Sequence, residues 1–287
     1  MNRNAIIMAA GMSTRFVPLS IEKPKALLNV KGEIMIERQI RQLKEAGVDE
    51  IVIVVGYLKE KFEYLKEKYG VILIENPYYQ VMNNFSTLYI ARDYLHNTFV
   101  CSADNYFVEN VFLEQEEQSY YSSVYVNGMT EEWCLKDDDS HKIIGVKVGG
   151  KDAWVMKGHV FLNEDFCKKL IPYLKQAFDV EAMWGKYWED IYIEHIHELE
   201  LYIKKYSSGI IEEFDSLEEL RSFDSSYIEH TGSAVLAEIC KKIGCKESEI
   251  EKIIPRKKNG EVIGFDFKCQ SIKYEYQYQA HKLVQKA

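Results

Sequence analysis

Short apolar segments alternate with amphipathic segments through the first hundred residues of the chain. Four short, mostly apolar runs have the length and composition of buried strands: residues 5–8, 51–55, 71–74 and 98–102. Three segments between them read as helices: residues 35–46, 60–69 and 86–95. In the first of these, Ile36, Ile40 and Leu43 fall on one face and Gly47 follows as a stop signal. This alternation predicts an α/β fold with a Rossmann-like, mostly parallel central sheet covered by helices.

The pattern changes after residue 118, where strand-forming residues and turns dominate. Three segments are predicted as antiparallel additions to the sheet: residues 121–126, 142–148 and 154–161. Two predicted helices and a late strand follow: residues 166–178, 182–196 and 199–203. We expect this first domain to comprise residues 1–223.

Residues 224–287 show a pattern of their own and predict a small α+β C-terminal appendage. Ser233 is a candidate N-cap for a short apolar helix that Gly244 ends. Asn259-Gly260 lies between strand-forming segments and predicts a hairpin turn. Every motif described below precedes this appendage, so we expect the reaction not to require it.

Charge and composition narrow the range of partners. Lys and Arg total 36 against 45 Asp and Glu, a net charge of −9, which argues against a broad nucleic-acid-binding face. The longest apolar runs are far shorter than the roughly 20 residues of a membrane span, so we expect no membrane insertion. No signal peptide is visible at the start, which makes the cytoplasm the expected location. The sequence leaves open whether the protein forms a homo-oligomer.

Cysteine and histidine residues give no metal signature. The six cysteines are scattered without a CxxC pair, and we expect free thiols. His195 and His197 are separated by one residue but lack a third ligand at a suitable spacing. No transition metal is assigned to them.

The loop after the first predicted strand carries the strongest chemical signal. It reads Ala9, Ala10, Gly11, Met12, Ser13, Thr14 and Arg15, and Lys23-Pro24-Lys25 follows. Small residues let backbone N–H groups approach phosphate oxygens, while Arg15 and Lys25 supply positive charge. The Gly-Lys-Ser/Thr of a Walker A loop and the dinucleotide GxGxxG pattern are both absent.

This loop resembles the signature of sugar-1-phosphate and alcohol-phosphate nucleotidyltransferases. Further motifs resemble bacterial CTP:phosphocholine cytidylyltransferases, in chain order: Val55-Gly56-Tyr57-Leu58-Lys59-Glu60, the segment 64–71, Asn83-Asn84-Phe85, Ala103-Asp104-Asn105-Tyr106, Glu132-Trp133 and Tyr187-Trp188-Glu189. The likeness extends over about residues 3–215. It implies a nucleotidyltransferase fold, a loop that wraps the triphosphate of CTP, and a lysine, Lys25, that contacts phosphate.

The resemblance also implies a metal ligand at Asp104. This residue ends a predicted strand at the edge where open α/β sheets bind ligands, and its carboxylate suits Mg²⁺. The family motif matching residues 187–190 supplies a second carboxylate. It more often has Asp where this chain has Glu189, and Asp190 comes one position later, so both stay candidates, with Glu189 preferred.

Two further groups of residues are candidates for substrate recognition. Asn83, Asn84 and Ser86 precede a predicted helix, and their polar groups can read the edge of cytosine or cap that helix. Trp133, Tyr187 and Trp188 are aromatic candidates for the cation of the acceptor, because aromatic faces bind trimethylammonium groups.

Together these features predict transfer of a cytidylyl group from CTP to phosphocholine, giving CDP-choline and pyrophosphate. Acceptors left open are 2-aminoethylphosphonate, phosphoethanolamine and a sugar 1-phosphate, and a second alternative is a non-catalytic nucleotide-binding regulator. The appendage resembles the first strands of a choline-kinase-type N-lobe through residues 249–255 and the hairpin that follows. It carries no kinase catalytic loop, so we expect no kinase activity.

Overall fold

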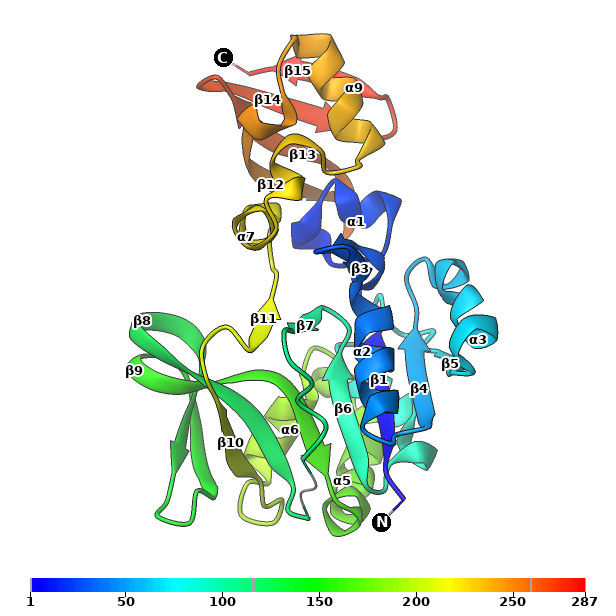
Figure 1. Ribbon diagram of the computed structural model, residues 1–287, viewed down its shortest axis with the longest axis vertical. Coiled ribbons are helices and arrows are strands. Elements are labelled where there is room, and N and C mark those ends of the chain that lie inside the picture. The colour runs from blue at the N-terminus through cyan, green and yellow to red at the C-terminus, as the bar shows by residue number, and fades with distance from the viewer. Residues whose placement is uncertain (1, 115–116, 259, 287) are drawn as a thin grey trace. The chain divides into compact units, whose positions relative to one another are not determined.

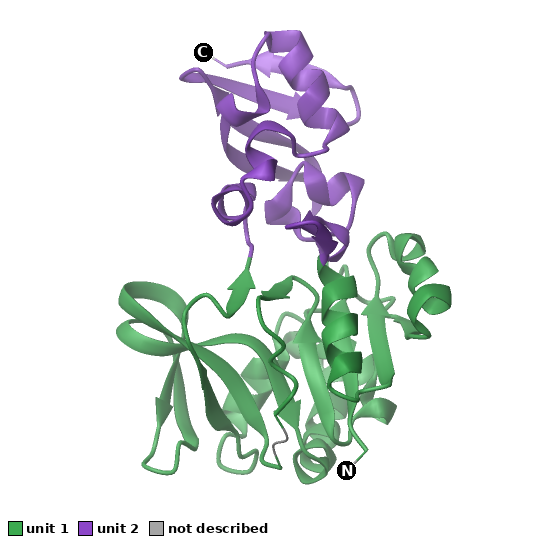
Figure 2. Ribbon diagram, viewed as in Figure 1, with its two compact units in different colours: residues 1–11, 35–213 green, residues 12–34, 214–287 purple. Residues whose placement is uncertain are grey.

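The computed structural model describes residues 2–114, 117–258 and 260–286. By internal contacts the chain divides into two compact units (Figure 2). Unit 1 comprises Met1–Gly11 and Met35–Glu213, and unit 2 comprises Met12–Ile34 and Phe214–Ala287. A short N-terminal segment therefore groups with the C-terminal residues. The two domains anticipated at residues 1–223 and 224–287 stay a prediction.

Unit 1 is built on a seven-stranded sheet with the strand order β10-β8-β9-β6-β1-β4-β5 (Figure 1). Its parallel part consists of β1 (Asn4–Ala9), β4 (Glu50–Val55), β5 (Ile72–Glu75) and β6 (Thr98–Ser102). β1 lies between β4 and β6, and the side chains of Ala5, Ile6 and Ile7 are completely buried. The four apolar runs thus form the strands that the sequence predicts, and the mostly parallel sheet is confirmed.

The helices of unit 1 lie at the predicted positions, but several of them are shorter than predicted. α2 (Met35–Glu45) and α5 (Glu164–Phe178) form as expected. α3 (Tyr64–Tyr69) follows a separate 3₁₀ turn, and α4 (Phe85–Ile90) gives way to another. At the second break the Arg92 guanidinium donates to the carbonyl of Tyr89, which satisfies a helix-end acceptor.

The region predicted as three short strands forms two long ones, β8 (Tyr120–Asp137) and β9 (Ile143–Leu162). They pair antiparallel to each other, and β9 also pairs antiparallel to β6. The prediction of separate segments was wrong because both strands continue through positions of irregular backbone instead of ending in turns. Gly128 and Gly149 both adopt positive φ, and register shifts occur along this ladder.

Two later elements are also displaced from their predicted positions. β10 (Tyr202–Tyr206) pairs parallel to β8, and its first residue is three positions after the first residue of the predicted strand. Leu199 and Leu201 are buried but precede the ladder. The helix predicted at residues 182–196 is a 3₁₀ turn followed by α6 (Trp188–Glu194). α6 starts there because the Asp190 carboxylate accepts the backbone N–H of Tyr187 in a capping box.

Unit 2 contains short helices, a two-stranded ladder and a four-stranded antiparallel sheet. Its N-terminal part holds α1 (Leu19–Glu22) and the pair β2 (Asn29–Val30) and β3 (Glu33–Ile34). Its C-terminal helices are α7 (Leu217–Phe223), α8 (Ser226–Glu229) and α9 (Ala234–Ile243). The sheet is formed by β12 (Ile250–Lys258), β13 (Glu261–Cys269), β14 (Ile272–Gln277) and β15 (Lys282–Gln285).

The predicted helix of the appendage is confirmed in detail. The Ser233 hydroxyl accepts the N–H of Leu236 at the start of α9, and Gly244 ends the helix with φ 77°. The predicted hairpin is present as the antiparallel pair β12 and β13, in which Lys258 is opposite Glu261. Asn259, half of the turn dipeptide, lies outside the described residues.

Two chain-wide features complete the fold. In the described part of the chain, no helix is long and apolar enough to cross a membrane. The six cysteines are free thiols. Cys245 lies near both Cys240 and Cys269 in unit 2, a cluster that the scattered sequence positions do not reveal.

Candidate active site

The loop motif begins at the end of β1, in unit 1. Ala9 and Ala10 are buried, whereas Gly11 is exposed with open space where a side chain would stand. The N–H of Tyr57 donates to the carbonyl of Ala10 at 3.1 Å. A Cβ on Gly56 would lie 2.9 Å from that same carbonyl oxygen, so only glycine allows this approach. Small residues therefore keep the backbone after β1 close to the end of β4.

Asp104 follows β6, the strand beside β1, as predicted from the sequence. The N–H of Ala103 donates to the carbonyl of Met8 at 3.1 Å, which joins the ends of the two strands. From α2, the amide of Gln39 donates to the carbonyls of Ser102 and Asn105 at 2.9 and 2.7 Å. The turn that carries Asp104 is thus held on both sides.

A second carboxylate, missed in the sequence, is brought next to Asp104 by strand pairing. β7 (Asn105–Phe107) pairs antiparallel to β11 (Ile211–Glu213), and Glu213 is opposite Asn105 in this ladder. Glu213 is therefore adjacent to the position that follows Asp104. The only sequence signal was an acidic residue near the end of the family resemblance, which no local pattern connects to residue 104.

The carboxylates suit a hard cation such as Mg²⁺. Among the described residues no group of three or more His, Cys, Asp or Glu side chains is arranged to hold a metal ion. Mg²⁺ needs no such group, because it usually binds through one or two carboxylates and fills its octahedron with water and substrate phosphates. Asp104, which follows β6, and Glu213, at the end of β11, are carboxylates of the kind that such a site uses.

Glu189, the preferred second ligand in the sequence, lies in a buried polar cluster of unit 1. Its side chain is 8% exposed. The Tyr121 hydroxyl donates to its Oε1 at 3.1 Å, and the Asn84 amide donates to its Oε2 at 3.3 Å. Burial raises the pKa of Glu189 to about 7, and the negative charge of Asp190 acts in the same direction. The two hydrogen bonds only partly offset this, so a cation near Glu189 would favour its ionised form.

Tyr121 links this cluster to Glu213. Burial raises the pKa of Tyr121 well above its ordinary value, and the charges of Glu189 and Glu213 raise it further. The Tyr121 ring stacks on Trp188, with centroids 6.0 Å apart and planes 7° apart. Asp104, Glu213, Tyr121 and Glu189 thus belong to one region of unit 1.

The residues predicted to read cytosine connect α4 to α6. The Asn83 amide donates to the carbonyl of Gly185 at 3.1 Å, and Asn84 Oδ1 accepts the N–H of Trp188 at 2.8 Å. Ser86 is fully buried, and its hydroxyl donates to the carbonyl of Asn83. Asn84 shows no side-chain capping bond at the start of α4. The three side chains are therefore held by protein groups, and recognition of cytosine stays a prediction.

The three aromatic candidates for the acceptor site differ in exposure. Trp133 and Tyr187 form an edge-to-face pair with centroids 5.9 Å apart, although 54 residues separate them in the sequence. Tyr187 is exposed at 46%. Trp188 is only 1% exposed and belongs to the hydrophobic core. The geometry favours Trp133 and Tyr187 as open aromatic faces and gives Trp188 a packing role beneath Tyr121.

The carboxylate of Asp190, the other candidate metal ligand from the sequence, accepts the N–H of Tyr187 in the capping bond at the start of α6.

In unit 2, Met12, Ser13 and Thr14 lead into the basic residues of the motif. Ser13 adopts a left-handed conformation with φ 46°, and its carbonyl accepts the N–H of Phe16. Arg15 is exposed, and its guanidinium contacts the Asp215 carboxylate at 2.8 Å. The Lys25 ammonium lies 3.9 Å from the same carboxylate and 5.3 Å from the Phe16 ring centroid. Asp215, a second residue missed in the sequence, thus neighbours both predicted phosphate-binding cations.

Comparisons with known proteins identify the family of the chain. A MobA-like NTP transferase domain matches residues 5–126. The choline-phosphate cytidylyltransferase of Streptococcus pneumoniae is 38% identical over 220 residues, which is 77% of this chain and 96% of that protein. The chain belongs to the bacterial choline-phosphate cytidylyltransferase family. It is thus a nucleotidyltransferase, as the sequence predicts.

Other relatives agree on the chemistry and differ in the acceptor. The 2-aminoethylphosphonate cytidylyltransferase of Lancefieldella rimae is 40% identical over 229 residues, 78% of this chain and 93% of that protein. The solved structure of the Streptococcus pneumoniae CTP:phosphocholine cytidylyltransferase superposes with a TM-score of 0.76, at 38% identity, over 79% of this chain and 99% of that one. The nucleotidyltransferase fold is confirmed, and members of this cytidylyltransferase family generally use a divalent metal.

Proposed function

We propose that this cytidylyltransferase transfers the cytidylyl group of CTP to phosphocholine, giving CDP-choline and pyrophosphate. The observation that carries the proposal is the 38% identity to a choline-phosphate cytidylyltransferase over nearly that enzyme's whole length. The edge-to-face pair of Trp133 and Tyr187 supports it, because aromatic faces attract a trimethylammonium group without a countercharge.

In the proposed reaction an oxygen of the acceptor's phosphate attacks the α-phosphorus of CTP in line, and pyrophosphate leaves. The acceptor phosphate is already anionic at neutral pH, so no side chain needs to act as a general base. No covalent enzyme intermediate forms. Catalysis then rests on positioning and charge neutralisation.

Different residues of the chain are proposed to bind the triphosphate and the metal ion. Arg15 and Lys25 are proposed to contact the triphosphate, and backbone N–H groups of residues 9–14 approach its oxygens. Asp104 is proposed to hold Mg²⁺, which neutralises charge at the reacting phosphate when bound. Glu213 is the second carboxylate that the β7–β11 ladder favours, while Glu189, preferred from the sequence, and Asp190 are the alternatives.

A second acceptor, 2-aminoethylphosphonate, is favoured by a separate observation. A primary ammonium pairs with a carboxylate, and Glu189 is a buried carboxyl whose hydrogen-bond partners, Tyr121 and Asn84, are both neutral. The 40% identity to a 2-aminoethylphosphonate cytidylyltransferase agrees with this. Phosphoethanolamine carries the same ammonium group.

The test is a coupled pyrophosphate-release assay with the full chain and Mg²⁺. CTP, ATP, GTP and UTP are each combined with phosphocholine, 2-aminoethylphosphonate, phosphoethanolamine and glucose 1-phosphate. We expect CTP with phosphocholine to give the highest kcat/KM. A phosphonate or sugar phosphate that exceeds phosphocholine by more than about tenfold, or 1.4 kcal/mol, contradicts the assigned acceptor.

A further inference from the structure

Two segments far apart in the sequence fold together as unit 2 (Figure 2). We call Met12–Ile34 the signature segment, since it carries Arg15 and Lys25, and Phe214–Ala287 the C-terminal segment. The contacts between these two segments argue against the expectation that the C-terminal residues are dispensable.

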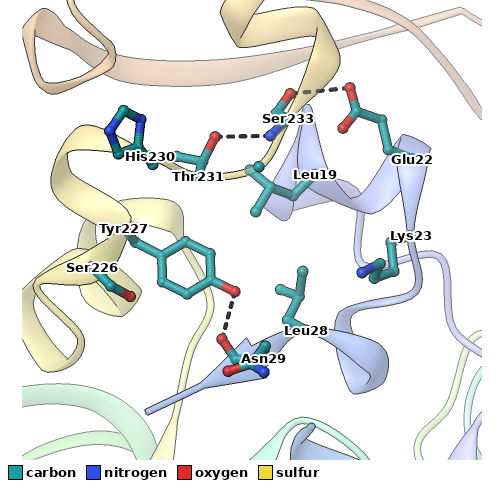
Figure 3. A pocket seen from close by; sticks show the side chains of 11 residues that line it. Leu19, Glu22, Lys23, Leu28, Asn29, Ser226, Tyr227, His230, Thr231 and Ser233 are labelled. Carbon is teal, nitrogen blue, oxygen red and sulfur yellow. Dashed lines mark hydrogen bonds between the residues drawn. The ribbon is translucent and has the colours of Figure 1, made fainter. Parts of the chain in front are cut away.

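The first contact joins Glu22, at the end of α1, to the start of α9. The Glu22 carboxylate accepts the hydroxyl of Ser233 at 3.1 Å (Figure 3). It also accepts the backbone N–H groups of Ala234 and Val235 at 3.2 and 2.9 Å. The first N–H groups of a helix lack partners within the helix and carry partial positive charge, so a carboxylate there is stabilising. Glu22 therefore completes the cap of a helix 211 residues further along the chain.

A second set of contacts holds the β2–β3 turn. The Tyr227 hydroxyl donates to the carbonyl of Asn29 at 2.8 Å (Figure 3). The Asp224 carboxylate accepts the N–H of Lys31 at 2.6 Å, and the Lys31 ammonium lies 4.0 Å from the Phe223 ring centroid. Asp224 and Tyr227 are both buried, which shields these bonds from water.

Lys25 lies between these two anchored points. It is three residues after Glu22 and four before Asn29, and its side chain is 5% exposed. A cavity of about 420 Å³ separates the two sets of contacts, lined by both segments and including Leu19, Leu28 and Tyr227 (Figure 3). The signature segment is also packed between its anchors, because Phe16, Leu27 and Val30 are buried. Loss of one anchor would loosen the backbone around Lys25.

The matched part does not account for the whole chain. The matches cover 96% and 99% of the Streptococcus pneumoniae protein but only 77% and 79% of this chain. About a fifth of this chain therefore has no counterpart in that protein.

We propose that the C-terminal segment positions the signature segment for CTP, with Glu22 as the positioning residue that links the two. The inference rests on the proposed function, since the positioned residues are those assigned to the triphosphate. Glu22 acts through the backbone and does not itself touch the nucleotide.

The test compares Glu22→Gln, which keeps the shape and removes the charge, with Glu229→Gln as control. Glu229 is an exposed residue of α8 in the same unit. Steady-state kinetics with CTP and the preferred acceptor give kcat and both KM values. We expect Glu22→Gln to raise KM for CTP about three- to tenfold, with kcat and the acceptor KM within about twofold, because removing a cap weakens a helix start measurably. Glu229→Gln should match the wild type.

Ser233→Ala and the double variant show whether the effect passes through α9. If it does, the double variant raises KM for CTP no more than Glu22→Gln alone. An unchanged KM for CTP in a folded Glu22→Gln protein, or additive effects in the double variant, would overturn the inference. If Glu22→Gln does not fold, Tyr227→Phe removes one hydroxyl at the other anchor and is judged by the same criteria.

Amide hydrogen exchange tests the positioning role independently of the proposed reaction. In the full chain without substrates, Glu22→Gln should speed amide exchange in residues 12–34 and leave β1, β4 and β6 unchanged. Exchange equal to the wild type contradicts the positioning role whatever reaction the protein performs. A wild-type protein that releases no pyrophosphate from CTP contradicts the proposed function and leaves the exchange result to decide the structural link.

Discussion

Glu189 of unit 1 and Asp215 of unit 2 are carboxyl groups with opposite kinds of partner. In unit 1, Glu189 is a buried carboxyl whose hydrogen-bond partners are the neutral groups of Tyr121 and Asn84. In unit 2, Asp215 is a half-exposed carboxylate beside two cations, Arg15 and Lys25. A carboxyl without a cationic partner gains when a ligand brings positive charge. Arg15 is exposed, so its ion pair with Asp215 contributes little in water and can be replaced by a contact to a polyanion.

From this difference we expect the two regions to bind ligands of opposite charge. The carboxylates of unit 1, including Asp104 and Glu213, suit a metal ion or the ammonium group of the acceptor. The cations of unit 2 suit a triphosphate. The predictions below test this assignment in order of decreasing effect.

Removing the charge of Asp104 should have the largest effect. Asp104→Asn keeps volume and hydrogen bonding but loses the charge proposed to hold Mg²⁺, so kcat should fall at least about a hundredfold, on the order of 3 kcal/mol. Pyrophosphate release measures this, and a thermal melt checks folding. Near-normal turnover in a folded Asp104→Asn protein contradicts the metal assignment.

The second carboxylate is identified in the same assay. Glu213→Gln, Glu189→Gln and Asp190→Asn are compared at saturating substrates over a range of Mg²⁺ concentrations. The variant that removes the true metal ligand should need a higher Mg²⁺ concentration for activity. The ladder that places Glu213 opposite Asn105 favours Glu213 as that ligand. Asp190→Asn should leave the Mg²⁺ requirement unchanged, since its carboxylate accepts the Tyr187 N–H.

Glu189 should also make stability depend on pH. Its folded pKa of about 7 lies above the ordinary 4.5, so between these values the unfolded chain has lost a proton that the folded protein keeps. Stability contributed by the protonated form is therefore complete below about pH 4.5 and falls as pH rises to 7, by up to about 3 kcal/mol.

Urea unfolding of the wild type and Glu189→Gln between pH 4.5 and 8, without metal or substrate, measures this loss. The glutamine variant should lack it. Glu181→Gln, at an exposed position before α6, is the matched control and should follow the wild type. Parallel curves for the wild type and Glu189→Gln would show that Glu189 is not a buried, cation-free carboxyl.

Lys25 tests the other side of the comparison. Lys25→Ala should lower kcat/KM for CTP by roughly ten- to a hundredfold, about 1.4 to 2.8 kcal/mol, because a charge-assisted contact to phosphate is lost. The KM for the acceptor should change little. An equal rise in both KM values would indicate a structural role for Lys25 instead of a triphosphate contact.

The smallest effect is expected at the aromatic pair. Trp133→Ala should raise KM for phosphocholine and leave KM for CTP unchanged. The rise should correspond to a lost binding free energy of roughly 0.5–2 kcal/mol, the range of a cation–π contact. Trp133→Phe keeps an aromatic face and should recover part of the loss. Equal changes for both substrates would place Trp133 in a packing role.

Much of the fold follows from local sequence. The apolar runs of β1, β4 and β6 and the capping residues Ser233 and Gly244 specify their elements through neighbours in the chain, which is why these predictions are confirmed. The long strands β8 and β9 were predicted in pieces because the continuity of a strand through irregular positions such as Gly128 and Gly149 depends on pairing with its neighbour. The place of Asp104 after β6 was predicted because strand ends in a parallel sheet share one edge, whereas its metal-binding role comes from the family resemblance and stays a prediction.

The remaining features depend on contacts that no local pattern encodes. Glu213 neighbours Asp104 only through the β7–β11 ladder, and Asp215 neighbours Arg15 across 200 residues of sequence. Glu22 gave no signal, because its partner is a helix end formed 211 residues later. The sequence by itself determined the elements, the family and the order of the motifs, since propensity and periodicity act over a few residues. The tertiary structure decided which charges meet and which stay buried without a cation, because pairing and burial depend on the whole folded chain.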